Sequence, residues 1–107
     1  MKPSKVKFIS KELEKKFNSL DEHDPIKKGI KKAIKNLKEE AFSGLQIPKR
    51  LFPKEYIKKF GINNLWKYDL PKAWRLIYTL NREGEVELIT AILDWFDHKS
   101  YEKKFKY

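Results

Sequence analysis

The last third of the chain limits the fold most strongly, because it reads as three β-rich runs separated by short turns. The runs cover residues 65–70, 74–80 and 86–93. Bulky apolar residues alternate along the first two runs, which is typical of strands with one buried face. The segment therefore predicts three consecutive strands of a sheet in which neighbours run antiparallel.

Bulky side chains also predict the register of the first hairpin. If residues 71–73 form the loop, each bulky residue of one strand faces another on the same side of the sheet. The facing pairs are Leu70 with Trp74, Tyr68 with Leu76 and Trp66 with Tyr78. A shorter loop would place the charge of Arg75 on the core side, which is unfavourable for an unpaired charge. The opposite face is thus the candidate working surface, and it carries Lys67, Asp69, Arg75 and Ile77.

Two helices are predicted before these strands. Residues 5–9 alternate polar and apolar as in a short strand, and Ser10 is placed to cap a helix with Leu13, Phe17 and Leu20 at helical spacing. Asp24 and Pro25 form a strong second helix start, and Gly44 is a reasonable stop. The buried stripe of this helix is Ile26, Ile30, Ala33, Ile34, Leu37 and Ala41. Its solvated face carries Lys27, Lys28, Lys31, Lys32, Lys35 and Lys38.

The middle of the chain, residues 45–62, reads as irregular. Pro48 and Pro53 interrupt it, and residues 53–60 predict a short helical turn ended by Gly61. Basic residues here and in the hairpin loop are candidates for substrate binding, namely Lys49, Arg50, Lys54 and Lys72. With a short C-terminal helix, residues 1–107 predict one α+β domain, a mainly antiparallel four-stranded sheet with two N-terminal helices on one face.

Charge narrows the class of partner. The chain has 25 Lys and Arg against 15 Asp and Glu, a formal net charge of +10. This excess favours a polyanionic partner, meaning nucleic acid, ribosome or membrane surface, although a lysine-rich or heat-adapted proteome has the same signature. There are no cysteines, so disulfides and thiolate metal sites are excluded. No apolar run has the length of a membrane span or signal peptide, so a cytoplasmic location is expected.

Two strings carry a family resemblance. The first is Trp74-Arg75-Leu76-Ile77-Tyr78 on a central strand, and the second is His98-Lys99-Ser100-Tyr101 after the last strand. With these strings and its element order, β-α-α-β-β-β-(α), the chain resembles toxins of the RelE/ParE superfamily of type II toxin–antitoxin systems. The resemblance is most specific between residues 66 and 101.

The resemblance implies a microbial toxin that inhibits translation by cleaving mRNA in the ribosomal A site, without metal or cofactor. It also implies a cognate antitoxin as protein partner. By the same likeness, Arg75 binds the scissile phosphate and Lys67 contacts phosphate or transfers a proton. Lys99 is the C-terminal basic residue, Tyr101 stacks on a nucleotide, and His98 is a candidate acid or base.

These residue types suit phosphodiester cleavage, in which a hydroxyl is deprotonated, charge on the phosphate is stabilised and the leaving group is protonated. An imidazole serves either proton step, and the planar fork of arginine suits the phosphate. Each of these residues also has an alternative role that is purely structural. Arg75 can be the partner of Asp69, His98 an ordinary surface group, and Tyr101 with Phe105 the anchor of the last helix.

Two departures from the family pattern affect the chemistry. Asp69 replaces a basic residue with a carboxylate that repels phosphate, and Lys99 replaces the usual arginine, which removes bidentate geometry. Asp94, Asp97 and His98 give only a weak metal pattern, because strand geometry separates the two aspartates. Two alternative functions therefore stay open: a non-catalytic toxin of the gyrase-poisoning branch, and a basic RNA- or ribosome-binding module.

Overall fold

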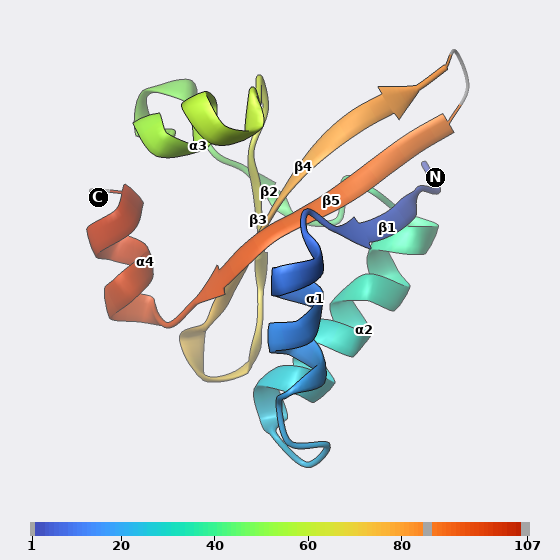
Figure 1. Cartoon of the computed structure of the whole chain (residues 1–107), viewed down its shortest axis with the longest axis vertical. Coiled ribbons are helices and arrows are strands. Elements are labelled where there is room, and N and C mark those ends of the chain that lie inside the picture. Colours follow the sequence, from blue (N-terminus) through green and yellow to red (C-terminus); the bar gives the residue numbers. More distant parts are fainter. Residues whose placement is uncertain (1, 85–86, 106–107) are drawn as a thin grey trace.

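A five-stranded mixed sheet organises the computed structural model of the chain, which describes residues 2–84 and 87–105 (Figure 1). Its spatial order is β1-β5-β4-β3-β2. β1 pairs with β5 in parallel, and the other neighbours are antiparallel. The strands are β1 Lys5–Phe8, β2 Leu45–Gln46, β3 Trp66–Asp69, β4 Arg75–Glu83 and β5 Glu87–Phe96.

Helices cover both faces of this sheet. Figure 1 shows α1 and α2 on one side and α3 and α4 on the other, and a separate apolar core lies under each pair. Ile30 and Leu37 of α2 pack in the first core, whereas Tyr56 of α3 and Phe105 of α4 pack in the second. The helices are α1 Lys11–Asn18, α2 Pro25–Glu39, α3 Lys54–Phe60 and α4 His98–Phe105.

The predicted hairpin register is confirmed. Trp66 lies opposite Tyr78 and Tyr68 opposite Leu76. The Leu70 N–H donates to the Trp74 carbonyl oxygen at 2.9 Å, which closes the loop over residues 71–73. Of the third predicted strand, Val86 lies outside the described residues, and β5 runs on past residue 93 to Phe96.

The α+β class is confirmed, but the predicted sheet layout is wrong in three respects. The fifth strand, β2, was missed because two residues are too few to show a period. The sheet also has one parallel pair: β1 lies beside β5 at one edge, and the chain crosses from β1 through α1 and α2 to β2 at the opposite edge. The single helix-covered face is wrong because Ile77, on the face predicted to be open, is buried with Leu93 in the core under α3 and α4.

Both N-terminal helices begin where the sequence predicts. The Ser10 hydroxyl accepts from the Leu13 N–H at 3.1 Å, and the Asp24 carboxylate accepts from the Ile26 N–H at 2.8 Å. Gly61 ends α3 with a φ of 60°, a left-handed conformation that favours glycine. The end of α2 was predicted incorrectly, because the helix stops at Glu39 and Gly44 lies beyond it.

Gly44 is explained by a close approach of two chain segments. A Cβ atom there would lie 2.6 Å from the Tyr78 hydroxyl and would overlap the carbonyl oxygen of Lys67. The Gly44 N–H instead donates to that hydroxyl, which in turn donates to the carbonyl of Ala41. Burial raises the pKa of Tyr78 to about 12, so the hydroxyl keeps its proton and can act as this donor.

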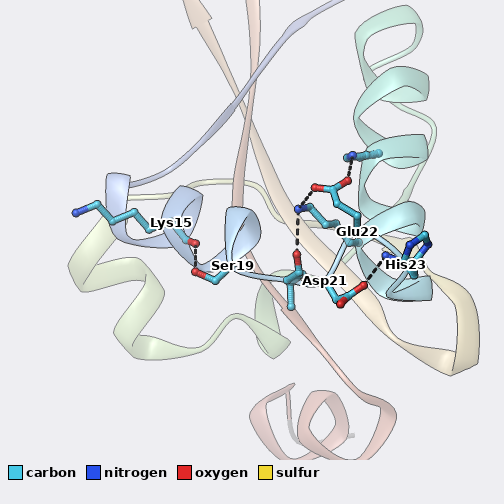
Figure 2. A network of polar contacts seen from close by, with 8 residues as sticks. Lys15, Ser19, Asp21, Glu22 and His23 are labelled. Atoms are coloured by element: carbon cyan, nitrogen blue, oxygen red, sulfur yellow. Dashed lines mark hydrogen bonds and ion pairs between the residues drawn. The ribbon is translucent and has the colours of Figure 1, made fainter.

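One lysine of α2 departs from the predicted solvated face. Lys27 is 4% exposed, and its ammonium donates to the Leu20 carbonyl and to Glu22. Lys31 donates to the other carboxylate oxygen of Glu22, so Glu22 bridges two successive turns of α2 (Figure 2). The network ties the loop between α1 and α2 to the start of α2.

Candidate functional site

Two cations of the sheet converge on one aromatic ring. The Lys67 ammonium on β3 lies 5.4 Å from the centre of the Tyr101 ring, and the Arg75 guanidinium on β4 lies 5.9 Å from it. Both side chains are only partly exposed. The hairpin register positions them, because Lys67 pairs with Ile77 and Arg75 with Asp69 on the same face. Three of the predicted site residues are thus brought together.

Arg75 is held on several sides. Its Nε lies 3.2 Å from Oδ1 of Asp69, and its Nη1 donates to the Trp74 carbonyl at 3.3 Å. Phe96 is its cross-strand neighbour on β5. The ion pair with Asp69 is the contact expected if Arg75 has a structural role, and the same arginine also lies against the Tyr101 ring.

Tyr101 is an anchor of α4 in this structure. Its side chain is 2% exposed, and its ring stacks on Phe105 with centroids 4.7 Å apart. A base cannot reach a ring that is covered in this way, so the stacking contact implied by the resemblance is not available in this conformation. The ring instead provides an electron-rich surface against which Lys67 and Arg75 lie.

The start of α4 holds the other predicted residues. Asp97 caps the helix by accepting from the Ser100 N–H at 2.8 Å, and this hydrogen bond lowers the pKa of its carboxyl. His98 is exposed and its Nε2 contacts the carboxylate of Glu102, one helical turn further on. Lys99 is exposed beside it. His98 and Lys99 therefore face solvent, whereas Tyr101 faces the sheet.

The four residues predicted to bind substrate are all exposed, and they come from three different short elements. Arg50 and Lys54 line a cleft of about 470 Å³ with Phe52 and Phe105. Lys72 lies in the β3–β4 turn and has a left-handed φ of 59°. Lys49 begins the 3₁₀ turn Lys49–Leu51.

Glu102 and Phe96 were missed from the sequence. Glu102 stands four residues after His98, and this spacing on a helix indicates a side-chain pair once the helix is recognised. Phe96 becomes a neighbour of Arg75 only through the β4–β5 register, which contains a bulge near Ile77 and Tyr78. Hydrophobic alternation does not reveal a bulge, so no sequence signal marked Phe96.

Other kinds of site find little support in the described part of the chain. Within residues 2–84 and 87–105, no group of three or more His, Asp or Glu side chains is arranged to hold a metal ion. None of the described helices is both long and apolar enough to cross a membrane.

In comparisons with known proteins, no family model, no curated protein and no solved structure matches the chain.

Proposed function

We propose that this chain is the toxin of a type II toxin–antitoxin system, a RelE-like endoribonuclease that cleaves mRNA on the ribosome. The observation that carries the proposal is the convergence of Lys67 and Arg75 on the ring of Tyr101. It involves residues of both motifs on which the family resemblance rests.

A pair of converging cations is best explained by an anionic ligand. Both cations lie against the same ring, so an anion bound at this ring would be attracted by both, and at Arg75 it would compete with the carboxylate of Asp69. The formal net charge of +10 favours the approach of a polyanion over that of a small neutral ligand. A phosphate of RNA fits both observations, and arginine presents the paired donors that phosphate accepts.

The proposed chemistry combines the two cations at the Tyr101 ring with His98 and Lys99 at the start of α4. In the proposed reaction the 2′-hydroxyl of RNA attacks the adjacent phosphorus, a 2′,3′-cyclic phosphate forms and the 5′-oxygen leaves with a proton. Arg75 and Lys67 stabilise charge on the phosphate, and the exposed imidazole of His98 transfers a proton. Lys99, exposed next to His98, contributes to phosphate binding. Tyr101 acts through the two cations that lie against its ring, in place of stacking on a base.

A protein partner belongs to the same proposal. A toxin of this kind is expected to be neutralised by an acidic segment of its cognate antitoxin, which folds as it wraps the basic toxin. Co-expression with the product of an adjacent gene tests this partner. Recovery of a stable complex supports the toxin assignment, and two folded proteins that do not associate count against it.

The direct test of the activity is primer extension on translated mRNA after induction of the wild-type protein. Cleavage within ribosome-bound codons is expected. Gyrase-dependent DNA breaks without RNA cleavage would instead indicate the gyrase-poisoning branch. Ribosome or RNA binding without either reaction would indicate a binding module.

A further inference from the structure

The carboxylate of Asp69 occupies the solvent side of the proposed phosphate-binding arginine. Asp69 and Arg75 are directly paired across β3 and β4, with Oδ1 and Nε 3.2 Å apart. The Asp69 side chain is 70% exposed and that of Arg75 only 20% exposed. An anion arriving from solvent therefore meets Asp69 before it meets the guanidinium.

This contact leaves a hydrogen-bond donor unused. The Arg75 Nε atom is buried, yet none of the described groups accepts a hydrogen bond from it, because Asp69 lies at ion-pair distance without the direction that a hydrogen bond requires. A buried donor without an acceptor is unfavourable. Asp69 thus neutralises charge at this position but does not satisfy the guanidinium.

The rest of the guanidinium is fixed while Asp69 is not. Nη1 donates to the Trp74 carbonyl, and the guanidinium carbon lies 5.9 Å from the centre of the Tyr101 ring. The exposed carboxylate of Asp69 makes no other hydrogen bond or ion pair among the described residues. Rotation of this one side chain would break the ion pair and leave the other two contacts of the arginine in place.

We propose that Asp69 is an internal competitor for the anion at Arg75, so that an RNA phosphate binds by displacing its carboxylate and by accepting the hydrogen bond that Nε cannot make to Asp69. The inference rests on the proposed function, because it assumes that Arg75 receives a phosphate. It assigns to Asp69 control of substrate affinity. The Asp69 half of this ion pair is exposed to solvent, which weakens the pair, so a phosphate oxygen that accepts from the guanidinium can replace the carboxylate.

Binding of a short RNA made entirely of 2′-O-methyl nucleotides tests this competition. Such RNA lacks the attacking hydroxyl, so its binding is measured without cleavage and without ribosomes. Asp69→Asn should tighten binding by about fivefold, the upper range for removal of one exposed ion pair. Glu39→Gln, an exposed carboxylate at the end of α2, changes the net charge equally and should leave affinity within about 1.5-fold.

A double-mutant cycle assigns the gain to the pair. In an Arg75→Gln background, Asp69→Asn should no longer tighten binding beyond the Glu39→Gln control, because the competitor has no cation to occupy. Equal RNA affinities for Asp69→Asn and Glu39→Gln would overturn the inference. So would an undiminished gain in affinity from Asp69→Asn in the Arg75→Gln background. Failure of all folded variants to bind the RNA would overturn it as well. If the wild type does not cleave mRNA on ribosomes but Asp69→Asn still binds the RNA about fivefold more tightly, the proposed nuclease is refuted and the competition by Asp69 stands.

Discussion

The amide of Gly44 donates a hydrogen bond of 3.0 Å to the hydroxyl of Tyr78, which joins the connection after α2 to the centre of the sheet. The same glycine lies against the backbone of Lys67, opposite which Leu45 of β2 is paired. The position of Lys67 in the proposed site therefore depends on a close approach that only glycine permits.

Gly44→Ala should destabilise the protein by about 1–3 kcal/mol, the usual effect of forcing an extra methyl group into a packed position. The methyl group would meet the Lys67 carbonyl, a backbone atom that has little room to move. Urea unfolding monitored by circular dichroism measures the effect. Gln46→Ala, at an exposed position of β2, serves as the control, and equal stability of the two variants would contradict the close approach.

Ala73→Gly should stabilise the β3–β4 turn by about 1 kcal/mol, because Ala73 has a left-handed φ of 63° that is unfavourable for a residue with a Cβ. The reverse change, Gly61→Ala, is the matched control. Gly61 has a φ of 60° and open space around its Cβ position, so alanine there should destabilise by a similar amount. Thermal unfolding of both variants is the measurement, and a loss of stability in Ala73→Gly would contradict the described turn.

Acid should destabilise the protein partly through Glu22. Hydrogen bonds from Lys27 and then Lys31 lower the pKa of this carboxyl to about 2. Because its pKa is lowered in the folded state, the stabilisation is fully present above the ordinary value of 4.5 and is lost as pH falls from there towards 2. Glu22→Gln should therefore lose less stability than the wild type between pH 5 and pH 2.

Urea midpoints across that pH range check the prediction for Glu22. Glu39→Gln, which removes an exposed carboxylate at the far end of α2, should keep the wild-type pH dependence. Parallel losses of stability in the wild type and Glu22→Gln would show that the network in Figure 2 does not stabilise the folded state through this carboxylate.

His98→Ala should change the pH–rate profile of mRNA cleavage, because the proposed role of the imidazole is proton transfer. The limb of the profile that depends on the protonation state of His98 should disappear, and the maximal rate should fall. His23→Ala is the control, since His23 lies in the loop between α1 and α2. A uniformly lower rate with the wild-type pH profile would remove His98 from the proton-transfer steps.

Particular residues show how far the sequence predicts the structure. The pairing of Trp66 with Tyr78 is predictable from bulky residues at alternate positions of the hairpin. The start of α2 is predictable from Asp24 and Pro25. Both signals are local in the sequence. The burial of Tyr101 and the second core under α3 and α4 depend on packing between segments distant in sequence. The convergence of Lys67 and Arg75 on one ring lies between these cases. The hairpin register placed both on one face, but only the docking of α4 supplied the ring.

The most direct test of the proposed nuclease is single-turnover cleavage of ribosome-bound mRNA by the folded wild type and by Arg75→Ala. The wild type should cleave, and Arg75→Ala should be slower by about a hundredfold or more, because it removes charge stabilisation at the phosphate. Arg82→Ala, an exposed arginine further along the same strand, should retain the wild-type rate within about threefold. Wild-type cleavage by Arg75→Ala, or no cleavage by the wild type, would contradict the account.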